Sequence, residues 1–209
     1  SLSDVTVEFT SGSDGSLPTT FSEGSTSIAF PNVNIWVDYI YLDTDERRKF
    51  AQLSHEYLIE QLQFTGEESI SSSTQTRLNF NHPVKELVWV EKSATVSRDI
   101  SYGDNLESAL LKLNGNDRFA RRDGKYFSHV QPYQHHTNIP DTNIKVYSFA
   151  IKPEEHQPSG TLNMSRIDSA ILAQKYSTTP ASSDTVSIFA VNYNVLRILS
   201  GMGGLAYSN

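Results

Sequence analysis

Strict alternation of apolar and polar residues dominates this chain, and it is the pattern of half-buried β-strands. It first appears at Val5, Val7 and Phe9, and the longest run covers 186–199. About eight such runs are present. They are residues 5–9, 33–42, 57–64, 77–81, 84–90, 144–151, 170–176 and 186–199.

Both faces of the run at 33–42 are apolar. Val33 and Ile35 would lie on one face, and Trp36 and Ile40 on the other. β-Branched and aromatic residues favour strands. We therefore expect a central strand that is covered on both sides.

A helical period replaces the alternation at 43–53, where Phe50 and Leu53 form a short apolar stripe. Asp43 or Thr44 can cap the N-terminus of this helix. The remaining residues of the run are mostly charged, so we expect them to form a solvated helix face.

A second amphipathic helix is predicted over 105–113, where Leu106, Ala109 and Leu110 recur at helical spacing. The Asn-Gly-Asn-Asp turn at 114–117 ends it. This helix lies within residues 92–142, a polar, aromatic and proline-punctuated region. The region is long for a connection inside a domain, so we expect an oversized surface loop region.

Helices are thus expected only inside connections, and no strand alternates regularly with a helix. A parallel sheet needs such helical crossovers. The pattern therefore favours an all-β fold, a two-sheet antiparallel sandwich. Stretches 11–27 and 65–76, which are rich in Ser, Thr, Gly or Glu, are predicted as loops.

The composition is that of a globular protein, with 37% hydrophobic and 20% charged residues. A formal net charge of −7 argues against a duplex nucleic-acid binder, which neutralises phosphates with Lys and Arg. No Cys is present, which excludes disulfides, thiolate metal sites and cysteine nucleophiles. No apolar run approaches the roughly 18 residues that span a bilayer. Ten Tyr, ten Phe and two Trp lean toward β structure.

The histidines do not form a metal-binding pattern. His135 and His136 are adjacent, and adjacent strand residues point to opposite faces, so the pair cannot chelate one ion unless the backbone kinks. His129 lies six residues before His135, and His156 lies well downstream. The closely spaced His-x-His and Glu of a β-barrel metalloenzyme are absent. We expect ordinary loop or buried histidines, and neither a metal nor another cofactor.

Catalytic motifs are absent as well. The chain has no Gly-x-Ser-x-Gly elbow, and Gly-Met-Gly-Gly at 201–204 lacks the Lys-Ser/Thr of a phosphate-binding loop. Glycosidase carboxylates usually come from separate strands, so one sequence neither confirms nor excludes them. Asn163-Met164-Ser165 matches a glycosylation sequon, which we interpret as a chance match.

One basic cluster is interleaved with aromatic residues. Its members are Arg118, Phe119, Arg121, Arg122, Lys125, Tyr126 and Phe127. The cluster suits contact with an acidic partner surface. The alternative is a solvated loop with its aromatic side chains turned inward.

Several stretches carry a combined signal in their order and spacing. They are residues 39–52, 55–63, 81–89, 147–168, 192–198 and 201–209. The most specific is 156–168, His-Gln-Pro-Ser-Gly-Thr-Leu-Asn-Met-Ser-Arg-Ile-Asp. Over residues 33–209 the chain resembles the C-terminal half of the major capsid protein of nucleocytoplasmic large DNA viruses.

The resemblance implies a double jelly-roll subunit, in which two eight-stranded antiparallel sandwiches stand side by side. Residues 1–209 would be a single jelly-roll domain, the second of the two, with short helices in long inter-strand loops. Residues 92–142 would belong to the outward tower of insertions.

The implied function is structural rather than enzymatic. Three full-length subunits would form a pseudo-hexagonal homotrimer, and trimers would tile the icosahedral shell of a virion assembled in the host cytoplasm. Neighbouring capsomers and minor capsid proteins would be partners. The shell would make no direct contact with nucleic acid and would have no transmembrane segment.

Such a function needs no catalytic, cofactor-binding or metal-binding residue. Aromatic and Arg side chains are favoured at interface cores, so the candidate subunit-contact residues are Arg118, Arg122, Tyr126, Phe127 and Tyr133. Family-motif residues expected to shape the structure are His82, Pro83, Pro153, His156, Pro158, Ser159, Gly160, Arg166 and Asp168. Prolines and a glycine at 153–160 would fix a crossing between strands, either as a buried corner or in contact with another subunit.

Two other functions are compatible with a β-sandwich. One is a glycan-binding, lectin-like module, and the other is a jelly-roll enzyme that uses His135 and His136. Fold alone does not decide among them, and the matched motifs favour the shell protein.

Overall fold

The computed structural model describes residues 6–7, 21–22, 27–28, 33–34, 36–92, 102–140, 143–177, 179–181 and 184–207. The chain divides into two compact units, Ser1–Lys49 and Phe50–Asn209. Every strand pair among the described residues lies within one unit or the other.

The first unit contains two short antiparallel ladders. They are formed by β1 (Thr6–Val7) with β4 (Val33–Asn34), and by β2 (Phe21–Ser22) with β3 (Ser27–Ile28). The described part of the predicted strand at 5–9 is β1, and its remaining residues lie outside the described ones. β2 lies inside the stretch 11–27, which was predicted as a loop.

The prediction of a covered central strand at 33–42 is wrong beyond Asn34. Residues 36–43 form no strand, and the side chain of Trp36 is 92% exposed. A strand needs a neighbour for its backbone N–H and C=O groups. Among the described strands none pairs with this segment, so an apolar pattern alone does not make it one.

The predicted helix at 43–53 is confirmed as α1 (Thr44–Gln52). The Asp43 side chain accepts a hydrogen bond from the Thr44 N–H at 2.7 Å, and its carbonyl accepts one from Arg47 N–H at 2.9 Å. Asp43 therefore begins the helix, as a capping residue does. None of the helix residues is buried, which suits its mostly charged sequence.

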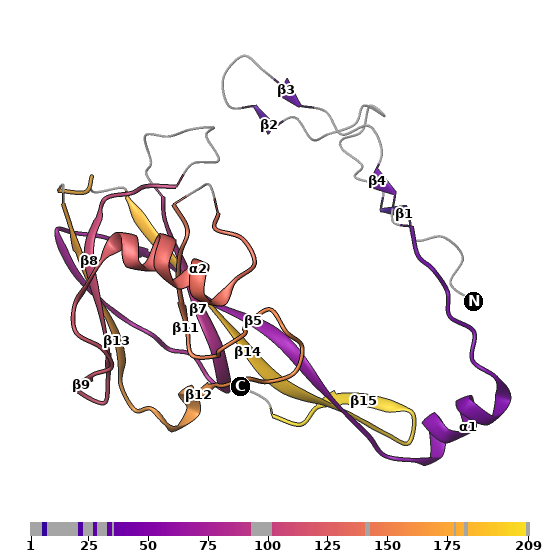
Figure 1. Ribbon diagram of the computed structural model, residues 1–209. Coiled ribbons are helices and arrows are strands. Elements are labelled where there is room, and N and C mark those ends of the chain that lie inside the picture. Colours follow the sequence, from indigo (N-terminus) through magenta and orange to yellow (C-terminus); the bar gives the residue numbers. More distant parts are fainter. Residues whose placement is uncertain are drawn as a thin grey trace. The chain divides into compact units, whose positions relative to one another are not determined.

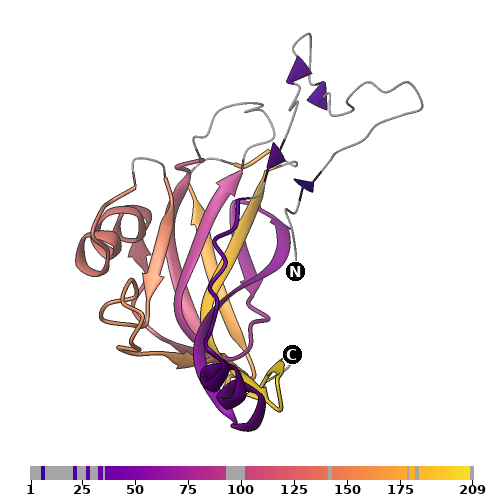
Figure 2. The ribbon, with the colours of Figure 1, turned by 90° about the vertical axis from the view of Figure 1, so that its right-hand side faces the viewer.

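The second unit is built on two antiparallel sheets that pack face to face (Figures 1 and 2). The β14 sheet contains β5 (His55–Ser69), β7 (Pro83–Lys92), β11 (Lys145–Ser148), β12 (Leu162–Asn163), β14 (Thr185–Leu199) and β15 (Met202–Leu205). The β13 sheet contains β6 (Ser73–Arg77), β8 (Leu106–Leu113), β9 (Asn116–Asp117), β10 (Arg122–Asp123) and β13 (Ala170–Tyr176). The predicted two-sheet antiparallel sandwich is confirmed.

The strand order is that of a jelly roll. The β14 sheet runs β5-β14-β7-β11 and the β13 sheet runs β6-β13-β8-β10, so the chain crosses repeatedly from one sheet to the other. These are the eight strands expected of two Greek keys. The two sheets nevertheless contain eleven strands, because β9, β12 and β15 add short ladders at their margins. Two of these three have only two residues, too few to show a period in the sequence.

The core lies between the sheets. Val84, Leu87 and Trp89 of β7 face Leu111 of β8 and Leu172 of β13 in one buried cluster. Each of these side chains is at most 2% exposed. Burial of large apolar side chains across such an interface is the main stabilising term of a sandwich.

The helix predicted at 105–113 is wrong, because this segment is the core strand β8. Leu106 pairs with Tyr176 and Ser108 pairs with Lys175, which leaves Glu107 as an extra residue on β8. This bulge places Leu106 and Ala109, three residues apart, on the same side. A strand with a bulge therefore imitates the spacing of a helix.

The described part of the 92–142 region is correspondingly more than a loop. Residues 106–113 belong to the core, and the predicted turn at 114–117 is confirmed as the β8–β9 hairpin. Asn114 (φ 50°) and Gly115 (φ 81°) adopt the left-handed conformations that a tight hairpin requires. A helical segment follows, η1 (Tyr126–Val130) and α2 (Gln131–His135).

Candidate assembly interface

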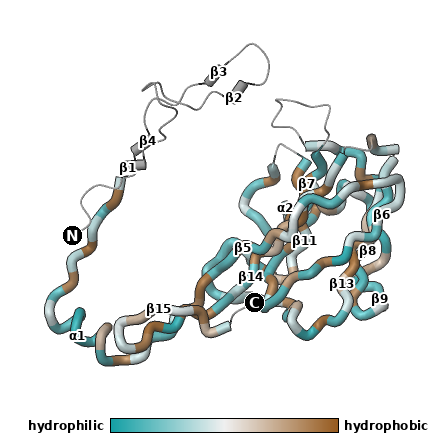
Figure 3. The backbone as a smooth tube through the Cα atoms, turned by 180° about the vertical axis from the view of Figure 1, so that it is seen from behind, coloured by the Kyte–Doolittle hydropathy of each residue, from teal (hydrophilic) through white to brown (hydrophobic). Residues whose placement is uncertain are grey.

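Three strands extend beyond the sandwich as a ribbon (Figures 1 and 3). This distal ribbon consists of residues 55–60 of β5, residues 193–199 of β14, and β15. Pairing between β14 and β7 ends at Asn192, whereas pairing with β5 and β15 continues to the end of β14. Its exposed apolar side chains include Tyr57, Leu58, Leu199, Met202 and Leu205.

The apolar surface continues from the ribbon along the outside of the β14 sheet. Residues directly opposite each other on paired strands share a face, and here these pairs are Leu58 with Val195, Leu62 with Val191, and Phe64 with Phe189. We call these six residues the outer stripe. The rings of Phe64 and Phe189 stack with centroids 4.7 Å apart, and Leu62 is 65% exposed.

Three of the four acidic residues of β5 are paired with basic residues of neighbouring strands. Glu56 contacts Arg197 at 2.6 Å, Glu60 contacts Lys85 at 2.7 Å, and Glu67 binds Lys92. The Lys92 ammonium holds the pKa of Glu67 below its ordinary value. Pairing satisfies each of these charges locally, so that a partner covering the outer stripe does not bury an unpaired charge.

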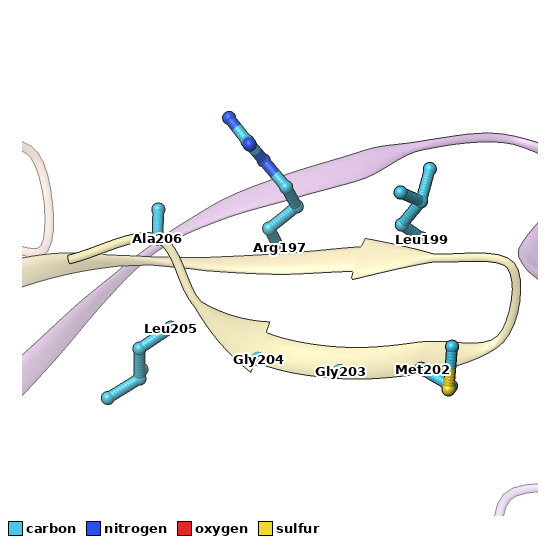
Figure 4. A pocket seen from close by; sticks show the side chains of 7 residues that line it. All are labelled: Arg197, Leu199, Met202, Gly203, Gly204, Leu205 and Ala206. Atoms are coloured by element: carbon cyan, nitrogen blue, oxygen red, sulfur yellow. The ribbon is translucent and has the colours of Figure 1, made fainter. Parts of the chain in front are cut away.

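The β14–β15 hairpin encloses a shallow hollow of about 350 Å³ (Figure 4). Its lining residues are Arg197, Leu199, Met202, Gly203, Gly204, Leu205 and Ala206. The only charged group in this lining is Arg197, which is bound to Glu56. The hollow thus offers no acid–base pair, and it is suited to an apolar side chain of a neighbour.

The predicted subunit-contact residues separate into two groups. Arg118, Arg122 and Tyr133 are exposed, with Tyr133 77% exposed, and Tyr126 is half-buried. The guanidinium of Arg122 lies 5.5 Å from the centre of the Tyr126 ring. These four side chains are accessible to a partner.

Phe127 does not fit the prediction that it contacts another subunit. Its side chain is fully buried, and its ring lies 5.2 Å from the Trp89 ring and 5.7 Å from the Phe119 ring. A side chain inside the core cannot reach another subunit. The aromatic pattern at 126–127 gave no indication of which ring points inward.

The family-motif residues His82 and Pro83, at the start of β7, bind the segment at 163–165. His82 adopts φ 64°, its N–H donates to Ser165 Oγ at 2.8 Å, and its carbonyl accepts from Met164 N–H at 3.0 Å. Pro83 then pairs with Asn163 of β12. The chain therefore bends at 82–83, and the bend anchors η2 (Met164–Arg166).

The remaining motif residues shape the connection from β11 to β13. Ser159 Oγ accepts from Lys152 N–H at 2.9 Å and closes the loop. At Gly160 (φ 150°) an added Cβ would lie 2.8 Å from the Phe149 carbonyl oxygen, so only glycine fits there. The Asp168 carbonyl accepts from Arg77. Pro153 is buried, whereas His156, Pro158 and Arg166 are exposed.

An ion pair lies inside the sandwich near one end of β7. Lys145 Nζ is 3.1 Å from Glu91 Oε1 and donates to the Gly103 carbonyl at 2.6 Å. Lys145 and Glu91 are 0% and 2% exposed. Burial raises the pKa of Glu91, and the nearby Lys145 opposes that shift. No sequence pattern indicates this pair, because its partners are 54 positions apart in the chain.

Within the described ranges, no group of three or more His, Asp or Glu side chains could hold a metal ion. None of the helices in the same ranges is both long and apolar enough to cross a membrane. The distal ribbon was also missed by sequence reasoning. Its one signal was the apolar character of both faces at 57–64, which indicates cover on both sides.

The profile described as "Large eukaryotic DNA virus major capsid protein" matches residues 46–204. The major capsid protein of Pyramimonas orientalis virus is 54% identical over an alignment that covers 89% of this chain and 51% of that protein. The major capsid protein of Paramecium bursaria Chlorella virus 1 is 44% identical, with 89% of this chain and 57% of that protein covered. The chain thus spans about half the length of these relatives.

One solved structure resembles the fold closely. It is the crystal structure of PBCV-1 VP54 fitted into a cryo-electron microscopy reconstruction of the virophage Sputnik. The TM-score is 0.76 at 40% sequence identity, and the match covers 93% of this chain and 62% of that one.

Proposed function

The chain belongs to the family of large eukaryotic DNA virus major capsid proteins, and we propose that it is a structural part of a virion shell rather than an enzyme. The observation that carries this proposal is the distal ribbon with the outer stripe. Glu60 and Tyr193 lie between the Leu58–Val195 and Leu62–Val191 pairs of the stripe. Exposed apolar side chains gathered on one face still mark a site that is covered in the functional state. A shell subunit needs such surfaces, and it needs no preorganised acid, base or metal.

In the full-length protein this chain contributes one jelly roll, the second of two that stand side by side. The relatives are about twice as long, which leaves room for a further sandwich. The first sandwich covers the outer stripe, and the exposed residues Arg118, Arg122, Tyr126 and Tyr133 contact other subunits. The absence of Cys suits assembly in the reducing host cytoplasm.

The full-length protein is expected to form a homotrimer, the unit that packs with neighbouring capsomers and minor capsid proteins. Light scattering at micromolar concentration should give the mass of three subunits. Stable interfaces bury about 800 Å² per partner, so a trimer of this kind should persist at that concentration. A monomeric mass would contradict the proposal.

Leu62→Glu tests whether the outer stripe is covered in the full-length protein. In the 209-residue chain Leu62 is largely exposed, so the substitution should change the free energy of unfolding by no more than about 0.5 kcal/mol. In the full-length protein it would bury an unpaired carboxylate, and we expect a clear drop in melting temperature.

Ile151→Glu is the matched control, because Ile151 is 70% exposed and lies on the loop after β11 rather than on a strand of the stripe. It should have the same small effect in the short chain and in the full-length protein. Equal effects of Leu62→Glu in both proteins would show that the stripe remains solvated.

A further inference from the structure

His136, the residue after α2, lies between two carboxylates from different parts of the fold. Its Nε2 is 3.1 Å from Oε2 of Glu86 on β7, and its Nδ1 is 3.2 Å from Oε1 of Glu154 in the loop after β11. The side chains of His136 and Glu86 are only 18% and 12% exposed. Three segments therefore meet at one imidazole ring.

The contacts of His136 with both carboxylates depend on whether its ring carries a second proton. A neutral imidazole carries a single N–H, whereas both ring nitrogens are donors in the imidazolium ion. Two ionised carboxylates, one at each nitrogen, are both satisfied only by the charged ring. In the neutral ring, one nitrogen lone pair would face a carboxylate oxygen.

We propose that His136 is a protonation-dependent latch, which holds α2 and the loop at 149–160 against the β14 sheet when it is charged and releases the sheet when it is neutral. No ligand or partner is needed for this switch. It is a conformational property of the jelly roll itself, and it does not rest on the assembly proposed above.

The contact that opens is the one with Glu86. Glu154 is held independently of the ring, because Thr137 N–H donates to both of its oxygens at 3.1 Å and Thr137 Oγ1 donates at 3.3 Å. By contrast, His136 Nε2 and Glu86 Oε2 have no hydrogen-bond partner in the described part of the chain, so only their charge contact at 3.1 Å joins them. Loss of the proton thus leaves a mostly buried carboxylate opposite a lone pair.

The direction of the pKa shift agrees with this geometry. The contact with Glu86 holds the pKa of His136 above its ordinary 6.5, Glu154 acts in the same direction, and burial opposes both. A raised folded-state pKa gives stability that is fully present below the unfolded pKa and lost as pH rises through the folded one. The Thr137 N–H lowers the pKa of Glu154, so that carboxylate remains ionised over this range.

The other titratable groups near the ring do not supply the same switch. On β14, burial and the nearby Glu60 and Glu86 raise the pKa of Tyr193, which therefore stays neutral. Lys85 is paired with Glu60 and lies over the Tyr193 ring. In the loop, Lys152 pairs with Glu155 at 3.0 Å. His135 faces the Ile151 carbonyl at 2.9 Å, which a neutral ring can also satisfy.

The test is the pH dependence of urea unfolding of the 209-residue chain between pH 5.5 and 9, for wild type, Glu86→Gln and His136→Gln. Wild-type stability should fall as pH rises through the His136 midpoint. Both variants should lose this fall. His129→Gln is the control, because its exposed ring contacts Ser128 and no carboxylate, so it should keep the wild-type slope.

Two further measurements on the wild-type chain test the latch even if a variant fails to fold. The NMR titration midpoint of His136 in the wild type should lie above 6.5, the ordinary value of a histidine. Amide exchange at 149–160, corrected for the intrinsic rate, should accelerate above that midpoint. A His136 midpoint at or below the ordinary value, or a wild-type slope in Glu86→Gln, would overturn the latch.

Discussion

Lys145→Met is expected to lower the free energy of unfolding by about 3–5 kcal/mol at neutral pH, because it leaves a buried carboxylate without its counter-ion. Glu91, only 2% exposed, would keep the Asn105 N–H as a donor at 3.1 Å but lose the ammonium group. The segment at 103–105 would lose an anchor as well, since Lys145 also donates to the Gly103 carbonyl.

The loss of stability in Lys145→Met should become smaller as pH falls. Burial already raises the pKa of Glu91, and removal of Lys145 would raise it further. A carboxyl with a raised folded-state pKa destabilises the fold as pH rises past its unfolded value. The variant should therefore recover part of its stability near pH 4–5, where urea unfolding would detect it.

Lys92→Met is the control for this experiment. Lys92 is the last residue of β7, and its ammonium binds Glu67 at the surface, where ion pairs contribute little. Its effect should be several-fold smaller than that of Lys145→Met. The double variant Glu91→Leu and Lys145→Met should recover much of the loss, because an apolar pair needs no charge compensation. Equal effects of the two Lys→Met substitutions would refute the proposed cost of the uncompensated buried carboxylate.

Phe127→Ala is expected to cost about 3–5 kcal/mol of unfolding free energy, the usual range for deletion of a buried aromatic ring. The side chain is 0% exposed, and its ring contacts those of Trp89 and Tyr126 at 5.2 Å. Thermal or urea unfolding of the 209-residue chain would measure the loss.

Tyr133→Ala provides the opposite case on the adjoining helix. Its ring is largely exposed, so the free energy of unfolding should change by no more than about 0.5 kcal/mol. If Tyr133 contacts another subunit, the variant should instead reduce association of the full-length protein. A stable Phe127→Ala chain with impaired association would restore the prediction that Phe127 is a contact residue.

Strands whose partners lie on both sides were predicted well. The run at 170–176 coincides with β13, and 186–199 differs from β14 by one residue. Both pair with a neighbour on each side over most of their length, and their apolar and β-branched residues are typical of buried strands. The turn at 114–117 was equally clear, because left-handed backbone favours Asn and Gly.

Secondary structure was predicted wrongly where strand pairing, rather than the local residue pattern, decides the conformation. A bulge at Glu107 gave β8 a helical spacing, and only its pairing with β13 shows the strand. The apolar residues at 36–42 have strand composition but no strand partner among the described residues. The polar stretch at 65–76 ends in β6, whose pairing with β13 outweighs its weak periodicity.

By itself, the sequence determined the all-β class, the antiparallel sandwich and the positions of β13 and β14, and its motifs indicated the capsid family. Those properties follow from the local period of burial and from short-range backbone preferences. Only the tertiary structure decided which aromatic ring enters the core, which carboxylates meet His136 and Lys145, and which apolar face stays exposed. These depend on contacts between residues far apart in the chain, and such contacts leave no periodic trace in the sequence.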